Sequence, residues 1–196
     1  MAKLSFYHQY FKNLTNTVKK LDLKKIDDIT SIIINAIKND KNIFIAGNGG
    51  AGSVANHMLC DFNKGIKISS KKKLMPKFIS LSSPIEQITA ISNDINYKKI
   101  FSFQIENYLK ENDVVILMSV SGTSPNIVDI LNFLQKKKCK VIFLTGFRKK
   151  ILKEKVDIYI NLKCKNYGIS EDIFCTILHV VSQKIRSNFN NYNEIL

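Results

Sequence analysis

The chain has 196 residues, of which 45% are hydrophobic and 23% charged, and its formal net charge is +14. This composition is typical of a globular protein and excludes disorder as the main state. The length suffices for one hydrophobic core, and no linker is visible, so we predict a single domain over residues 1–196. The uninterrupted apolar runs, such as 114–118 and 173–178, are far shorter than the roughly 18–20 residues of a membrane-spanning helix, so no such helix is expected.

The periodicity of apolar residues predicts the elements in chain order. Helical spacing predicts two opening helices, over residues 4–20 and 23–40. Short β-branched and aromatic runs predict five strands, at 43–46, 77–81, 114–118, 141–145 and 157–161. Further helical patterns cover residues 53–62, 83–92, 97–110, 124–137 and 169–188.

Strands that are apolar throughout and alternate with helices are typical of a parallel sheet covered on both faces. We therefore predict an α/β fold with a doubly wound, five-stranded parallel sheet, in which residues 41–196 form the α/β core and residues 1–40 a helical extension. Such sheets bind ligands beyond the carboxyl ends of the strands, where the strand order reverses. The loops after the first and third strands are the expected place of the site.

Two features bear on the compartment. The N-terminal residues lack the basic start, apolar middle and small-residue cleavage site of a secretory signal. The four cysteines show no CxxC pairing, and we expect reduced, mostly buried thiols at Cys60, Cys139, Cys164 and Cys175. Both features predict a cytoplasmic protein.

The positive charge comes almost entirely from lysine, with arginine only at 148 and 186. Scattered solvated lysines and a phosphate-rich partner are both compatible with this excess. The lysine runs at 71–73 and 136–138 are not interleaved with aromatic residues, and no recognition motif accompanies them. A nucleic-acid partner is therefore not expected.

A hydroxyl-rich loop follows the third predicted strand. Residues 119–126 read Ser-Val-Ser-Gly-Thr-Ser-Pro-Asn, and Pro125 suits the first turn of a helix. Backbone N–H groups at a helix start, together with several hydroxyls, form a good site for an anion such as phosphate. The alternative is a serine-rich turn in which Ser124 merely caps the helix.

The glycine loop at 47–52 fits neither a dinucleotide fingerprint nor a P-loop, although its glycines permit close approach of a ligand. On the helix that follows, His57 and Asp61 share a face, and the last helix carries Glu171 and His179. Imidazoles and carboxylates from two helices could bind zinc or move protons on a substrate. Alternatively, they are ordinary helix residues with local hydrogen bonds. Residues 90–97 are predicted to be a loop between helices.

Together these pieces resemble the sugar isomerase (SIS) domain family, and within it the phosphoheptose isomerases. The resemblance rests on motifs whose order and spacing span most of the chain. The motifs are residues 46–50 with His57, residues 90–94, 119–126 and 144–146, and the pair Glu171 and His179.

The resemblance implies a flavodoxin-like SIS fold and an aldose–ketose isomerase. Such an enzyme converts sedoheptulose 7-phosphate to D-glycero-D-manno-heptose 7-phosphate through an enediol. It would supply nucleotide-heptose (ADP-heptose) synthesis for a bacterial surface polysaccharide such as lipopolysaccharide. Members of the family are usually homotetramers in which the N-terminal helices and the helix bearing His57 are buried between subunits.

The resemblance also implies roles for individual residues. Asp61 would be the general base and His179 the matching acid. Some members hold one zinc ion between the positions of His57, Asp61, Glu171 and His179. The residues implied in substrate binding are Asn48, Gly49, Gly50, Ser53, Asp94, Ser119, Val120, Ser121, Ser124 and Glu171.

Three residues depart from the family pattern. Asp61 stands where glutamate is usual, which withdraws the carboxylate by roughly 1.5 Å, and a misplacement of this order costs about a hundredfold in rate unless the helix moves inward. Ala51 replaces a phosphate-contacting serine. Glu171 replaces a commoner glutamine, and its added charge favours a metal ion. These departures leave a second function open, because SIS domains also serve as phosphosugar-binding sensors and as partners of a replication initiator.

Overall fold

The computed structural model describes residues 2–147 and 156–189, with side chains from residue 5 onward. Five parallel strands form one sheet in the order β2-β1-β3-β4-β5. This order belongs to the flavodoxin-like class of doubly wound sheets, so the predicted fold class is confirmed. The strands are β1 (Asn42–Gly47), β2 (Lys77–Ser80), β3 (Val114–Ser119), β4 (Lys140–Thr145) and β5 (Ile158–Asn161).

Helices connect the strands and cover the sheet. The α-helices are α1 (Ala2–Val18), α2 (Leu23–Lys38), α3 (Gly49–Leu59), α4 (Lys67–Ser69), α5 (Ile85–Asp94), α6 (Ser102–Glu106), α7 (Pro125–Leu134) and α8 (Tyr167–Ser187). A π-helical segment, Cys60–Ile66, joins α3 to α4, and a 3-10 turn, Tyr97–Lys99, precedes α6. Local residues determine where two of the helices begin. The Asp22 carboxylate caps α2 by accepting hydrogen bonds from two backbone N–H groups, and Pro125 is the first residue of α7.

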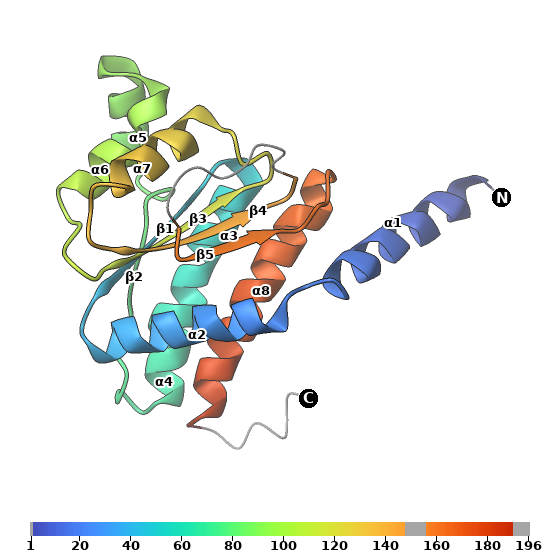
Figure 1. Ribbon diagram of the computed structural model, residues 1–196, viewed down its shortest axis with the longest axis horizontal. Coiled ribbons are helices and arrows are strands. Elements are labelled where there is room, and N and C mark those ends of the chain that lie inside the picture. Colours follow the sequence, from blue (N-terminus) through green and yellow to red (C-terminus); the bar gives the residue numbers. More distant parts are fainter. Residues whose placement is uncertain (1, 148–155, 190–196) are drawn as a thin grey trace.

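Alternate residues of the three central strands, β1, β3 and β4, enter two separate cores. In β3, Ile116 and Met118 pack with α2, α3 and α8, whereas Val115 and Leu117 pack with α5, α6 and α7. Figure 1 shows these two helical layers on opposite faces of the sheet, with α1 projecting away from them. Burial on both faces explains why the strands are apolar without alternation.

The helix after β1 is longer than predicted. Gly49 and Gly50, expected in a loop, begin α3, and the helical path continues without a break to Ser69 instead of ending at Phe62. The buried residues Ala51, Ala55 and Phe62 pack this path against the sheet, and this tertiary packing outweighs the low helix propensity of glycine.

Two other predictions between β2 and β3 are wrong. The helix predicted over 83–92 runs to Asp94, so residues 93–94, expected in a loop, belong to the last turn of α5, where Ile91 is buried in the core while Asn93 and Asp94 are exposed. The single helix expected over 97–110 is two short turns. Lys99 and Ser102 both bind the buried carboxylate of Asp129, which fixes the chain at the break between them.

The structure describes all four cysteines, and they are free, as predicted. The expectation that they are mostly buried is wrong: Cys60 is exposed, and Cys139, Cys164 and Cys175 are half-buried, because each lies at the edge of a packed face. Burial raises the pKa of Cys139 to about 11, with Asp157 and Asp113 adding to the effect. Among the described helices, none has the length and apolarity required to cross a membrane.

Gly47 is a position where α3 allows no side chain. A Cβ atom there would lie 2.7 Å from the backbone carbon of Ala51. We expect Gly47→Ala to lower the free energy of unfolding by about 1–3 kcal/mol, measured by urea denaturation. Gly65→Ala is the matched control, since its Cβ would meet Arg186 only at 3.6 Å. Equal stability of the two variants would contradict the close approach of Gly47 to α3.

Candidate active site

The site begins where the strand order reverses. β1 and β3 are neighbours in the sheet, but the chain leaves them toward opposite faces, into α3 and into the loop before α7. Ligands of doubly wound sheets bind in the crevice that this reversal creates. The two loops singled out in the sequence therefore meet at one edge of the sheet.

A small cavity of about 70 Å³ lies between these loops and the start of α8. Its walls carry hydroxyl, amide and carboxylate groups. The lining residues are Asn48, Ala51, Ser119, Val120, Ser121, Ser124, Tyr167 and Glu171. Six of these eight were predicted to bind substrate, and the structure brings those six together.

The hydroxyls of the serine loop are oriented by the loop itself. Ser119 Oγ accepts from the backbone N–H of Gly122 at 3.1 Å and lies 3.3 Å from Ser124 Oγ. Ser121 Oγ accepts from the backbone N–H of Thr123 at 3.3 Å. Ser124 precedes α7 without a side-chain capping bond, so its hydroxyl remains beside the cavity. Hydroxyls at a helix start form a favourable environment for an anion.

Asn48 joins the two sides of the crevice. Its amide exchanges two hydrogen bonds with the amide of Asn126, at 2.9 and 2.8 Å, and its Oδ1 also accepts from Tyr97 Oη at 3.1 Å. Asn126 is fully buried, so the pair is held rigidly. The role of Tyr97 was missed, because only the folded chain brings it to Asn48.

Glu171 closes the cavity from α8. Its carboxylate accepts from the backbone N–H of Ala51 and lies where a Cβ atom of Gly50 would be, so position 50 must be glycine for this contact. Burial, with a smaller effect of Asp172, raises the pKa of Glu171 above its usual value.

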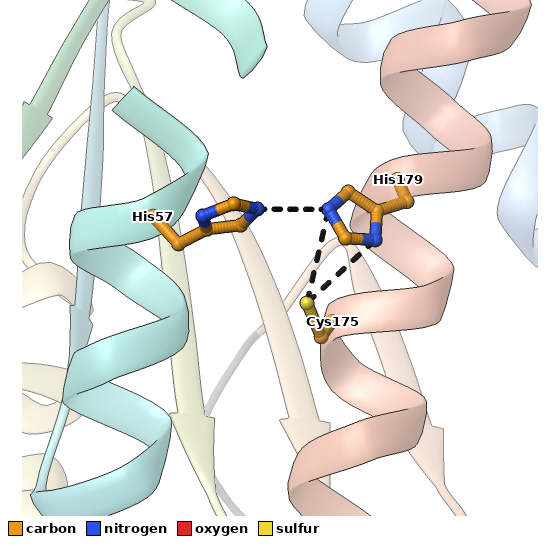
Figure 2. Close-up of side chains that lie close together, drawn as sticks. All are labelled: His57, Cys175 and His179. Carbon is orange, nitrogen blue, oxygen red and sulfur yellow. Dashed lines mark hydrogen bonds between the residues drawn. The ribbon is translucent and has the colours of Figure 1, made fainter. Parts of the chain in front are cut away.

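One face of α8 meets α3 farther along its length. His57 Nε2 lies 3.0 Å from His179 Nε2, and Asp61 Oδ2 lies 3.1 Å from the same atom of His179. The two rings are nearly perpendicular, and their Nε2 atoms point toward each other across the gap between the helices, as Figure 2 shows. The His179 and Asp61 side chains are 36% and 27% exposed, so solvent and small molecules reach them.

Cys175 lies one helical turn before His179 and points toward the two imidazoles (Figure 2). Its Sγ is 3.7 Å from Nδ1 and 3.9 Å from Nε2 of His179. Burial, followed by the charges of Asp61 and Asp172, raises the pKa of this thiol. The sequence held a signal for Cys175, because it stands four residues from both Glu171 and His179 and therefore shares their face.

Asp61 reaches His179 despite its short side chain. It belongs to the π-helical segment Cys60–Ile66, in which the wider turn displaces the backbone. The Asp61 carboxylate lies 3.1 Å from His179 Nε2, whereas the expected loss of catalytic reach relative to glutamate stays a prediction. π-helical turns are frequent at functional sites.

Comparison with known proteins identifies the family. A family model described as the SIS domain matches residues 6–146. The chain belongs to the SIS domain family. A phosphoheptose isomerase of Geotalea uraniireducens is 30% identical, covering 80% of this chain and 82% of the relative. The phosphoheptose isomerase of Geotalea daltonii is 31% identical, with 80% of each chain covered.

A solved structure gives the same fold. The phosphoheptose isomerase of Neisseria gonorrhoeae superimposes with a TM-score of 0.79 and 20% identity, covering 95% of this chain and 97% of that chain. The resemblance to the SIS family and to phosphoheptose isomerases, read from the motifs, is therefore confirmed.

Some predicted residues of this SIS domain lie outside the cavity walls. Ser53 is exposed on α3 and donates to Gly49 O at 3.4 Å. Gly49 is also exposed, at the first position of α3. Asp94 is exposed at the end of α5 and accepts from Asn93 Nδ2. Their roles in substrate binding stay predictions.

Proposed function

We propose that this SIS-domain protein is a phosphoheptose isomerase, which interconverts sedoheptulose 7-phosphate and D-glycero-D-manno-heptose 7-phosphate in the cytoplasm. The observation that carries the proposal is the pairing of the Asp61 carboxylate with the His179 imidazole between the two helices, α3 and α8, that also border the hydroxyl-lined cavity. The names of the curated relatives support the same activity. Its product would supply nucleotide-heptose synthesis for a surface polysaccharide.

The spacing of the two parts of the site fits a long sugar phosphate. Glu171 lines the cavity and His179 follows eight residues later, which corresponds to about 12 Å along the helix axis. The serine loop would hold the phosphate, and carbons C1 and C2 would lie beside His179. A seven-carbon chain with a terminal phosphate comes closer to spanning this length than a triose phosphate does.

The proton transfer would use the two paired side chains. Asp61 takes the proton from C1 of the ketose to give the enediol, and a proton is returned to C2 of the aldose. His179 donates a proton to the C2 carbonyl oxygen as negative charge develops on it, and takes up the proton of the C1 hydroxyl when the C1 carbonyl forms. The neighbouring rings and carboxylate keep both groups oriented.

The donor set around His179 also fits a zinc ion. His57 Nε2 and Asp61 Oδ2 both lie within hydrogen-bonding distance of His179 Nε2. A ring nitrogen carries either one hydrogen or one lone pair in the ring plane, so His179 Nε2 does not form an ordinary hydrogen bond with both neighbours at once. These three residues would hold the ion. A bound zinc ion supplies Lewis-acid polarisation of a substrate carbonyl.

A homotetramer is part of the proposal. α1 projects from the fold and exposes large apolar side chains, including Phe6 at 67% and Phe11 at 62% exposure. The cavity of about 70 Å³ is far smaller than the roughly 300–1,000 Å³ of ordinary ligand sites. Walls contributed by another subunit would complete it. Sedimentation of the purified protein measures the assembly.

Ala51 favours a second candidate, a phosphosugar-binding protein without catalysis or a partner of a replication initiator. It lines the cavity with a methyl group where the family usually has a serine hydroxyl. NMR of the purified protein with sedoheptulose 7-phosphate separates the two functions. An isomerase forms the aldose heptose, and a sensor binds the ketose unchanged.

Ser121→Ala tests the phosphate assignment. Ser121 lines the cavity, and loss of a hydrogen bond to a charged group costs about 1.5–3 kcal/mol. We expect KM for the sugar phosphate to rise by at least about tenfold with little change in kcat, and inhibition by inorganic phosphate to weaken in parallel. Thr123→Ala, an exposed change in the same loop, is the control. An unchanged KM would place the phosphate elsewhere.

A further inference from the structure

The helix α8 presents three potential metal ligands on one face, at residues 171, 175 and 179. Only two of these belong to the ligand positions that the family resemblance implies. Among the described residues, the group whose donor atoms all lie within 4.8 Å of one another is His57, Cys175 and His179. The sulfur of Cys175, and not the carboxylate of Glu171 that the family pattern implies, therefore lies beside the two imidazoles.

The distances from His179 Nε2 to the other donor atoms are close to those of a tetrahedral zinc site. Zn–N bonds of about 2.05 Å and Zn–S bonds of about 2.3 Å place two nitrogen ligands about 3.3 Å apart, and nitrogen and sulfur about 3.6 Å apart. From His179 Nε2, the other donors lie at 3.0 Å for His57, 3.1 Å for Asp61 and 3.9 Å for Cys175. His57, Cys175 and His179 already lie close together, whereas Asp61 lies outside the group whose donor atoms are all within 4.8 Å of one another, so its carboxylate must turn toward the ion when the metal binds.

Glu171 is engaged elsewhere. Its carboxylate accepts from the Ala51 N–H and packs on Gly50 at the start of α3, on the wall of the cavity. Joining the imidazoles would break this hydrogen bond, whereas Cys175 Sγ already lies beside His179. Zinc binds a soft thiolate readily alongside imidazole and carboxylate ligands.

We propose that Cys175 is the fourth metal ligand of this protein, so that a zinc ion is held by His57, Asp61, Cys175 and His179, with Glu171 left on the cavity wall. The thiol loses its proton to solvent when the metal binds, and no other bond changes. This inference shares its site with the proposed function: a zinc ion with four protein ligands has no open position, so Asp61 and His179 move protons in the metal-free protein.

The experiment is metal substitution without turnover. The full-length protein is stripped with a chelator and titrated with Co²⁺, and the absorption spectrum is recorded. We expect one Co²⁺ per chain, visible bands of a tetrahedral ion, and a near-ultraviolet charge-transfer band that only a sulfur ligand produces. In Cys175→Ser the charge-transfer band disappears, and zinc affinity measured against a chromophoric chelator falls at least about tenfold.

Two variants serve as controls. Cys60→Ser removes an exposed thiol next to Asp61, and Glu171→Gln removes the alternative ligand's charge; both are expected to keep the band. A spectrum without the band, a band that survives in Cys175→Ser, or no stoichiometric Co²⁺ binding would overturn the assignment. Conversion of sedoheptulose 7-phosphate, assayed separately, tests the proposed function. The assignment of Cys175 as a ligand and the proposed function can therefore each fail independently of the other.

Discussion

Replacing His179 by alanine is expected to lower kcat by about 10²–10⁴-fold while the protein still folds. The imidazole lies at a partly exposed gap between α3 and α8, so its removal leaves the buried faces of both helices packed. What is lost is the proton donor to the substrate oxygen and the partner of Asp61. Steady-state kinetics and the melting temperature measured on the same preparation check both statements.

Two further measurements separate catalysis from structure. Imidazole added to His179→Ala is expected to restore part of the activity, because the truncated side chain leaves space at the exposed gap. His179→Gln, which keeps much of the volume without an acid of suitable pKa, is expected to remain inactive. Near-normal turnover in the alanine variant would show that His179 does not move a proton.

Asp61→Asn is expected to have an effect of similar size, about 10²–10⁴-fold on kcat. The amide has the shape of the carboxylate but takes up no proton from carbon. Asp61→Glu is also expected to be slower than the natural protein, because the π-helical segment already brings the shorter side chain to 3.1 Å from His179 Nε2. Both variants are compared by kcat and by the urea midpoint.

Asp172→Asn is the matched control for charge. Asp172 is exposed on α8, one residue after Glu171, and it acts on Glu171 and Cys175 only through its field. Its neutralisation is expected to change kcat less than about threefold. A comparable loss in both aspartate variants would mean that net charge, rather than the Asp61 carboxylate, determines the rate.

The sheet was predictable because its three central strands, β1, β3 and β4, are buried on both faces. A strand that is buried on both faces is apolar throughout, as residues 114–118 are. Such continuous apolar strands are typical of a parallel sheet covered by helices. The start of the helix after β1 was predicted too late in the chain, because the local propensity of the glycines at 49 and 50 indicates a turn. The buried face of Ala51 and Ala55 decides the start of α3, and that information is tertiary.

The site was predictable to the extent that it follows the fold. The serine loop, Asn48 and Glu171 meet because the carboxyl ends of adjacent strands share one edge. The Asp61 contact was not predictable, because helical spacing assumes regular turns and the chain inserts a π-helical one. Tyr97 and Cys175 became evident only when partners distant in sequence were placed beside them.

Solvent exchange during turnover tests the central claim most directly. Sedoheptulose 7-phosphate is incubated with the protein in deuterated water, and both sugars are analysed by NMR and mass spectrometry. Proton transfer through Asp61 and His179 predicts deuterium at C2 of the aldose heptose and, on reversal, at C1 of the ketose. Aldose formed without deuterium, or bound ketose that never exchanges, would contradict an isomerase that works through these two side chains.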